Sequence, residues 1–278
     1  MGHRYPQLLG MRLRYLFLLF LSLLCKDLRA QVWELGVQGG GAGYMGDLNP
    51  DNPLKISGSS FGAFLKANLD PNWALSFNYN MGKIKADDAK SSSVQFQQRN
   101  LNFYNKLHEF SVLLDFNFTD YFAAGGTKQV SPYMYVGLAG VLSNPKTRYM
   151  GREYELALYT TEGQASPYKK AALSMPIGAG IKVNFSENLS VISNIGYRNA
   201  YTDYLDDVSG SYPDYAVFSN SPPQVQAIQF ALSDRSAEKL GTAIGKKGTQ
   251  RGDFRKRDTY MFVGIGISYT FVSQKCPR

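Results

Sequence analysis

The sequence predicts an all-β fold, an eight-stranded antiparallel up-and-down β-barrel that crosses a membrane with its strands. Three observations predict it: an export signal that no long apolar helix follows, eight segments of alternating apolar and polar residues, and short connections that alternate with long ones. Successive side chains of a strand point to opposite faces. A strand with one apolar face therefore suits a barrel that meets lipid outside and encloses a polar lumen.

Residues 1–30 have the organisation of a secretory signal peptide. Arg12 and Arg14 precede an apolar run from Tyr15 to Cys25, and Ala30 offers a small residue for cleavage before Gln31. The run is too short for a membrane-spanning helix, which needs about 20 residues. We therefore expect export and cleavage after Ala30, which leaves residues 31–278 as the barrel with its loops. Either Met1 or Met11 could be the translation start.

Eight segments have the alternation of strands. It is clear in residues 73–81, 108–118, 173–186 and 258–271, and weaker in residues 32–47, 58–69, 131–143 and 189–203. Each is near or above the roughly 9–11 residues that cross a bilayer at a tilt. A soluble β-sandwich would also alternate, but its strands are usually about five or six residues long. The length of the segments therefore favours the transmembrane barrel.

The connections between these segments alternate in length. Asp70-Pro71-Asn72 and Ser186-Glu187-Asn188 are brief turns, whereas residues 83–106, 144–170 and 204–257 form long loops. Short periplasmic turns and long extracellular loops are the arrangement of outer-membrane barrels. The link at residues 119–131 is long for a periplasmic turn, and two interpretations stay open. It is either a tolerated insertion or a periplasmic docking surface.

Six charged residues fall on the face opposite the predicted lipid face. They are three acids and three bases: Glu34, Lys66, Glu109, Asp115, Lys182 and Arg198. An eight-stranded barrel is just wide enough inside for side chains to fill it, and buried charges are tolerated when they are paired. We therefore predict a filled lumen with an ion-pair network. Open porin channels need about sixteen strands, which argues against a general porin.

The composition leaves little material for catalysis. Without residues 1–30 the chain keeps one histidine, His108, and one cysteine, Cys276, so neither an internal disulfide nor a His/Cys metal cluster is available. His108 lies on the lipid-facing phase, so we predict no enzyme, cofactor or metal site. The signal carries five bases and one acid, and its removal lowers the formal charge from +8 to +4. The reduced charge argues against binding of nucleic acid.

Four loop and strand features bear on possible contacts. Asp203, Asp206 and Asp207 could bind calcium through carboxylate oxygens, but their spacing matches no calcium loop and a turn-forming acidic stretch is favoured. The bases of the last loop (Arg255-Lys256-Arg257, Lys246 and Lys247) would attract lipopolysaccharide phosphates. Arg251-Gly252-Asp253 matches an adhesion tripeptide, a match that is common by chance. In the last strand, Gly266, Tyr269 and Phe271 resemble the terminal signal that the barrel-assembly machinery reads.

Several short motifs, in order along the chain, resemble the PorG family of Bacteroidetes. They are Trp33-Glu34-Leu35-Gly36-Val37, Tyr44-Met45-Gly46-Asp47-Leu48, Thr161-Glu162-Gly163-Gln164, Gly196-Tyr197-Arg198, Thr202-Asp203-Tyr204-Leu205-Asp206-Asp207-Val208-Ser209, Leu232-Ser233-Asp234-Arg235-Ser236 and the strand from Tyr260 to Phe271. The stretch from Thr202 to Ser209 is the most specific of them. PorG-like proteins are outer-membrane barrels of the type IX secretion system.

The resemblance implies a non-enzymatic role, in which the barrel tethers the periplasmic ring of that secretion system to the outer membrane. The implied partners are the ring lipoprotein PorK and its companion PorN, and the family offers no catalytic residues. The alternative is a general surface barrel, an adhesin or a lipopolysaccharide-stabilising protein with no role in secretion. The basic, long outer loops favour that alternative.

Overall fold

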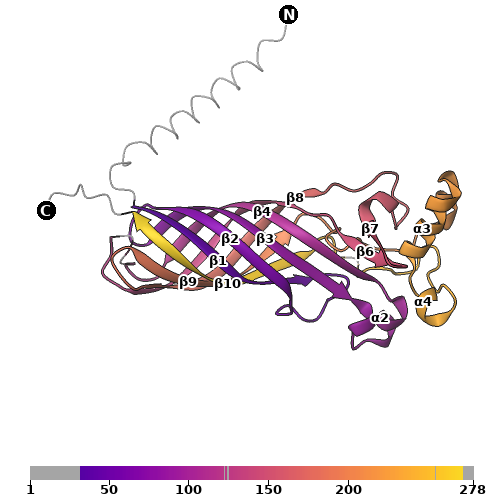
Figure 1. Ribbon diagram of the computed structural model, residues 1–278, viewed down its shortest axis with the longest axis horizontal. Helices are drawn as coiled ribbons and strands as arrows, with labels where there is room; N and C mark the ends of the chain where they lie inside the picture. The colour runs from indigo at the N-terminus through magenta and orange to yellow at the C-terminus, as the bar shows by residue number, and fades with distance from the viewer. Residues whose placement is uncertain (1–31, 122, 124, 254, 272–278) are drawn as a thin grey trace, which may run out of the picture.

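A computed structural model describes residues 32–121, 123, 125–253 and 255–271 of the chain. The signal peptide, its cleavage site and Cys276 lie outside the described residues. Eight long antiparallel strands form the body of the molecule (Figure 1): β1 (Val32–Met45), β2 (Ile56–Asn68), β3 (Trp73–Asp87), β4 (Asn102–Asn117), β5 (Val130–Leu142), β8 (Ala171–Asn184), β9 (Leu189–Ala200) and β10 (Thr259–Phe271).

These strands close into a barrel. Their order is β3-β2-β1-β10-β9-β8-β5-β4, and the pairing of β3 with β4 completes the circle. The first and last strands lie side by side, with Trp33 opposite Phe271 and Met45 opposite Thr259. The start of β1 and the end of β10 therefore lie at one end of the barrel, and the helices lie at the other (Figure 1). The predicted eight-stranded antiparallel barrel is confirmed.

Two strands extend beyond the segments predicted from alternation. β3 continues to Asp87 and β4 begins at Asn102, so the loop expected at residues 83–106 spans only residues 88–101. It contains η2 (Asp88–Lys90) and α2 (Val94–Arg99). Lys83 and Lys85 keep the outward phase of β3 but are not apolar. The ladder thus continues past the apolar part of the wall.

The other two long loops contain regular structure that alternation did not predict. Residues 144–170 include the hairpin of β6 (Lys146–Tyr149) and β7 (Arg152–Glu155), which joins β4 through Tyr104 and Lys146, and η4 (Leu156–Tyr159). Residues 204–257 include η5 (Tyr215–Asn220), α3 (Pro223–Ser233) and α4 (Ala237–Leu240). Together with α2 these elements cover the loop end of the barrel (Figure 1). We call this assembly the cap.

The outer wall of the barrel is apolar. Large hydrophobic side chains are exposed on all eight strands, among them Val37, Leu65, Phe77, Val112, Val136, Ile177, Ile195 and Ile265. Exposed aromatic residues gather at the end opposite the cap: Trp33, Trp73, Phe118, Phe185 and Phe271. Aromatic girdles of this kind mark the membrane–water interface of transmembrane barrels. None of the helices in the described part of the chain is long and apolar enough to span a bilayer.

Inside the barrel, aromatic rings lie over glycines of the neighbouring strand. Tyr135 of β5 is paired with Gly178 of β8, and Tyr133 with Gly180. A Cβ atom on Gly178 would collide with the Tyr135 ring. Because these glycines have no side chains, the tyrosine rings can lie flat across the lumen. Side chains fill the interior of an eight-stranded barrel. A larger apolar cluster, which includes Leu107 and Tyr260, lies toward the cap.

Candidate functional sites

We call the end of the barrel where β1 begins and β10 ends the terminal end. The lumen near this end holds one cluster of charges. Lys66 Nζ of β2 lies 2.5 Å from Asp115 Oδ2 of β4, and Lys182 Nζ of β8 lies 3.5 Å from the same oxygen. Lys182 also donates to Asn117 Oδ1 at 2.7 Å. Glu34 accepts from Ser268 Oγ at 2.5 Å and forms no ion pair among the described residues. One carboxylate therefore contacts two buried lysine side chains.

A second charge cluster lies closer to the cap. Arg198 Nε is 3.2 Å from Glu109 Oε2, which also accepts from the Tyr260 hydroxyl at 2.7 Å. Asn80 donates to the other Glu109 oxygen at 3.1 Å. The structure thus brings five of the six predicted lumen charges into ion pairs, in two separate clusters rather than one network.

The lumen between these clusters is filled. A cavity lined by Gln38, Lys66, Asn80, Asp115, Tyr135 and Arg198 measures about 30 Å³. That volume holds only about one or two water molecules. The polar side chains that line it bind each other across the barrel; for example, Gln38 donates to Asn80 and accepts from Asn194. This arrangement leaves no room for a solute.

The link at residues 119–131 turns back across the terminal end of the barrel. Tyr121 is fully buried, its hydroxyl donates to Ser190 Oγ at 2.5 Å, and Lys182 Nζ lies 5.3 Å from its ring centroid. Lys128 N donates to Asp120 O at 2.8 Å, which brings these two residues of the link together. Tyr121 therefore covers the terminal end of the lumen, while Thr127, Lys128 and Gln129 are exposed.

The stretch from Thr202 to Ser209 lies across the opposite mouth of the barrel. Leu205 and Val208 are buried in the apolar cluster, and Asn105 of β4 donates to Leu205 O at 2.8 Å. The Tyr44 hydroxyl of β1 donates to Asp206. Tyr204 stacks on Tyr168 with ring centroids 4.5 Å apart, and Thr202 O accepts from Asp258 N. The most specific motif of the sequence thus seals the mouth.

The other cap motifs meet around one buried arginine. Arg251 Nη1 lies 3.0 Å from Glu162 Oε1 and donates to Asp207 O at 2.7 Å, while its Nε donates to Ser233 O. Asp207 also accepts from Thr161 Oγ1 at 2.6 Å. Residues of three sequence motifs therefore converge on Arg251. Because Arg251 is 2% exposed, the tripeptide Arg251-Gly252-Asp253 is not displayed for adhesion.

The three aspartates singled out in the sequence do not act together. Asp206 accepts from Tyr44 and Asp207 pairs with Arg251, whereas Asp203 lies near Asp47 and Asp258. Carboxylate oxygens of these last three lie within 4.8 Å of one another. Burial first, and then the neighbouring carboxylates, raise the pKa of Asp47 to about 7. Burial likewise raises the pKa of Asp203 to about 6.

The bases of the last loop are partly neutralised within the cap. Lys247 Nζ lies 2.5 Å from Asp214, and Arg255 Nε lies 3.1 Å from Asp253. The Arg257 guanidinium lies 4.1 Å from the Tyr201 ring centroid. Lys246 is exposed.

The residues of the terminal strand signal take opposite faces of β10. Tyr269 and Phe271 are about half exposed on the outer wall, at the aromatic end. Gly266 faces inward opposite Gln38, and a Cβ atom there would collide with the backbone of Val37. His108 lies on the outer wall, where its Nδ1 is 2.8 Å from the Tyr79 hydroxyl.

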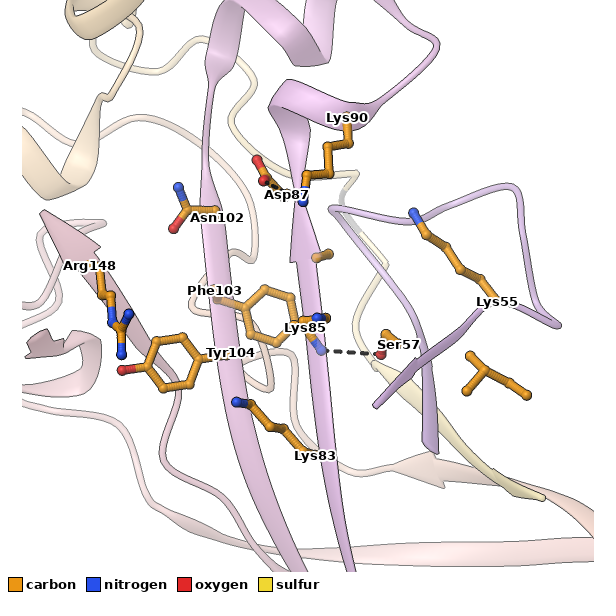
Figure 2. A pocket seen from close by; sticks show the side chains of 12 residues that line it. Lys55, Ser57, Lys83, Lys85, Asp87, Lys90, Asn102, Phe103, Tyr104 and Arg148 are labelled. Atoms are coloured by element: carbon orange, nitrogen blue, oxygen red, sulfur yellow. Dashed lines mark hydrogen bonds and ion pairs between the residues drawn. The ribbon is translucent and has the colours of Figure 1, made fainter. Parts of the chain in front are cut away.

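A basic groove on the outer wall did not emerge from the sequence. It lies where β2, β3 and β4 approach the cap, has a volume of about 710 Å³, and is lined by the basic residues Lys55, Lys83, Lys85, Lys90 and Arg148 (Figure 2). Asp87 is the carboxylate among its described lining residues. We call this the outer-wall groove. The alternation of residues in the sequence could have indicated part of this groove, because Lys83 and Lys85 continue the outward face of β3 beyond Met81.

Fold and sites together define a class: a closed, filled eight-stranded barrel with an apolar outer wall and a sealed mouth. The chain belongs to the family described as a domain of unknown function (DUF6089), whose model matches residues 13–222. No curated protein matches the chain.

Several solved structures are similar in fold. The outer membrane protein OprG from Pseudomonas aeruginosa is 9% identical, with a TM-score of 0.41 over 88% of this chain and 98% of that chain. Ail, the attachment invasion locus protein of Yersinia pestis, in complex with the heparin analogue sucrose octasulfate, is 10% identical, with a TM-score of 0.40 over 87% and 99%. The N-terminal β-barrel domain of Pseudomonas aeruginosa OprF is 12% identical, with a TM-score of 0.38 over 87% and 98%.

Proposed function

We propose that the protein is a non-enzymatic outer-membrane β-barrel that anchors the periplasmic ring of the type IX secretion system. The observation that carries the membrane assignment is an apolar outer wall on all eight strands around a filled polar lumen. Such a wall is stable only when lipid covers it, because apolar area exposed to water costs about 25 cal/mol per Å². A filled lumen leaves no path for a solute, so the function must lie on the outer surface of the barrel or at its ends.

The secretion role is supported by the motifs that resemble the PorG family. The loop motifs are structural in this chain, because Leu205, Asp207 and Ser233 are buried in the mouth or around Arg251. The first and last motifs, Trp33–Val37 and Tyr260–Phe271, form parts of the wall strands β1 and β10. Buried motifs preserve the cap but do not reach a partner. The surface available to a periplasmic partner lies at the other end, on the link around Tyr121. Its exposed residues Thr127, Lys128 and Gln129 are held in place by the buried ring.

The proposed partners follow from that placement. A PorK-type ring lipoprotein with its PorN-type companion would contact the link at residues 119–131. The barrel-assembly machinery would read Gly266, Tyr269 and Phe271 during insertion, and lipopolysaccharide would surround the cap side of the outer wall.

Site-specific photocrosslinking in native membranes tests the ring contact. A crosslinking amino acid at Lys128 should capture the ring lipoprotein, whereas the same group at Lys239, an exposed residue of α4, should not. Deletion of the gene should block export of type IX cargo. Normal export in the deletion strain, or equal capture from both positions, would contradict the proposal.

The alternative function is a general surface barrel, an adhesin or a lipopolysaccharide-stabilising protein. The basic outer-wall groove favours it, because that groove faces the surroundings of the barrel rather than the periplasm. This function predicts defects of adhesion or of the envelope in the deletion strain while cargo export continues. The export assay therefore separates the two functions.

A further inference from the structure

The outer-wall groove lies immediately beyond the apolar wall on the cap side. Along the outward phase of β3, Phe77, Tyr79 and Met81 are exposed and apolar, and Lys83 and Lys85 follow. Two residues of a strand rise by about 7 Å. The ammonium groups therefore lie one step above the belt that lipid tails would cover, at the height of lipid headgroups.

The protein balances the charge of the groove only in part: Asp87 is among its lining residues, and Glu153 lies opposite Arg148 in the strand register. Lys83 of β3 lies directly opposite Lys106 of β4 in the strand register. Like charges in directly opposite positions destabilise a sheet, so this pairing calls for an anion from outside. Of the groove's bases, only Lys90 belongs to an ion pair within the described residues, at 3.7 Å from Asp87. Figure 2 shows the basic side chains around the open space of the groove.

We propose that the outer-wall groove binds the phosphate groups of lipopolysaccharide in the outer leaflet. The inference rests on the outer-membrane location proposed above, but not on a role in secretion. The groove's volume of about 710 Å³ lies in the range of sites for small ligands, about 300–1,000 Å³, and can hold a phosphorylated sugar. Basic residues attract phosphate, and a guanidinium such as that of Arg148 can bind it through two nitrogens.

The surroundings of the groove favour a lipid over a soluble polyanion. The exposed Met81 lies directly below Lys83 on β3, and on β4 the exposed Phe110 lies below Lys106 and His108. Met81 and Phe110 offer apolar contact to acyl chains. A ligand that is both phosphorylated and acylated satisfies the two surfaces at once. The opposite end of the barrel has an aromatic girdle instead, which fits a membrane whose outer leaflet alone carries phosphorylated glycolipid.

The test compares two matched double substitutions in the full chain refolded into nanodiscs. K83Q/K85Q removes two charges of the groove, and K239Q/K246Q removes two exposed charges of the cap. Binding of bisphosphorylated lipid A would be measured by native mass spectrometry. We expect K83Q/K85Q to weaken binding about 10-fold or more, because each base close to a charged membrane surface strengthens binding about fivefold. The control pair should change binding by less than about 2-fold, because Lys239 and Lys246 do not line the groove.

Two further probes identify the ligand. Dephosphorylated lipid A should bind the wild-type protein weakly, and inorganic phosphate should displace lipid A only at far higher concentrations. Equal binding of the dephosphorylated lipid, equal loss in both variants, or displacement by phosphate at lipid-like concentrations would overturn the inference. Heat-modifiable migration on gels reports barrel insertion separately. A protein that never inserts refutes the outer-membrane location, whereas an inserted barrel without phosphate selectivity refutes only the lipid site.

Discussion

Asp115 forms the ion pairs of the charge cluster near the terminal end of the lumen. It is the only carboxylate within ion-pair distance of Lys66 or Lys182 in the described structure, and all three side chains are at least 95% buried. Removing one partner of a buried ion pair leaves an uncompensated charge, which usually costs more than the pair contributes. The stability of the barrel should therefore depend strongly on this one residue.

We predict that Asp115→Asn destabilises the barrel by about 3–5 kcal/mol. The amide keeps the shape of the carboxylate, but it cannot form an ion pair with Lys66 or Lys182. Urea unfolding in lipid vesicles, followed by the fluorescence of Trp33 and Trp73, measures the change. The matched control is Ser111→Ala, since the Ser111 hydroxyl is buried with no hydrogen-bond partner among the described residues. A loss in Asp115→Asn no greater than in Ser111→Ala would show that lumen pairing contributes little.

At the scale of elements, the cap is held by Arg251. Its guanidinium joins three loop segments through Glu162, Asp207 and Ser233. We predict that Arg251→Ala destabilises the cap locally by about 3–5 kcal/mol, because two buried carboxylates lose their partner. Limited proteolysis of the inserted protein should then cut within residues 204–257, while the barrel strands stay protected.

Arg255→Ala is the control for that substitution. Arg255 is half exposed and contacts Asp253 at 3.1 Å, and exposed ion pairs contribute only about 0–1 kcal/mol. Its cleavage pattern should match the wild-type pattern. Similar protection of the loop in Arg251→Ala would mean that the apolar cluster alone holds the cap.

Acidic residues make the cap sensitive to pH. The pKa of Asp47 is about 7 and that of Asp203 about 6, against an ordinary value of 3.8, and burial raises the pKa of Asp258 well above that value too. Between about pH 4 and pH 7 the folded cap therefore binds more protons than the unfolded cap. Its stability must therefore fall as pH rises through this window.

Hydrogen exchange measures this dependence. After correction for intrinsic exchange rates, amides of residues 200–210 should be better protected at pH 5 than at pH 8. The double variant D47N/D203N should reduce the difference, since it removes two of the raised carboxyl groups. Better protection at pH 8 in the wild-type protein would contradict the assignment of protonated carboxyls.

The sequence predicted strands better than it predicted the cap. Alternation is a local property of residues two apart, so it located all eight barrel strands and separated inward Glu109 from outward Phe110. Cap contacts join residues far apart in the chain, such as Glu162 and Arg251. No local pattern encodes them. The outer-wall groove could not be predicted for the same reason, because Lys55 and Arg148 come close to β3 only when the strands form the barrel.

The sequence favoured a turn-forming acidic stretch at Asp203, Asp206 and Asp207, but it did not indicate the contacts of these residues. Asp203, Asp206 and Asp207 are neighbours in the chain, but the turn directs them to three different partners. Asp207 has a positive φ of 75°, a backbone conformation that L residues seldom adopt. The reversal at this residue helps to explain why Asp207 reaches Arg251 while Asp203 lies beside Asp47 and Asp258. Adjacency in sequence therefore indicated an acidic region but not its contacts.

At the scale of the whole molecule, the two ends of the barrel differ outside as well as inside. The aromatic residues Trp33, Trp73 and Phe185 surround the terminal end, and lysines follow the apolar wall on the cap side. The apolar wall between them is the part that lipid must cover. If lipid covers it, the cost of a charge on the wall must depend on how deep the residue lies.

Substitution by lysine at two depths tests this directly. Ile265 lies in the middle of β10 and is 63% exposed on the wall, whereas Val130 is the first residue of β5 and is 52% exposed. We predict that Ile265→Lys destabilises the inserted barrel by about 2–4 kcal/mol and Val130→Lys by about 0–1 kcal/mol, the values for the bilayer centre and the interface. Both free energies would be measured by reversible unfolding from vesicles. In a water-soluble barrel both lysines would be harmless, so equal and small effects would place this wall in water.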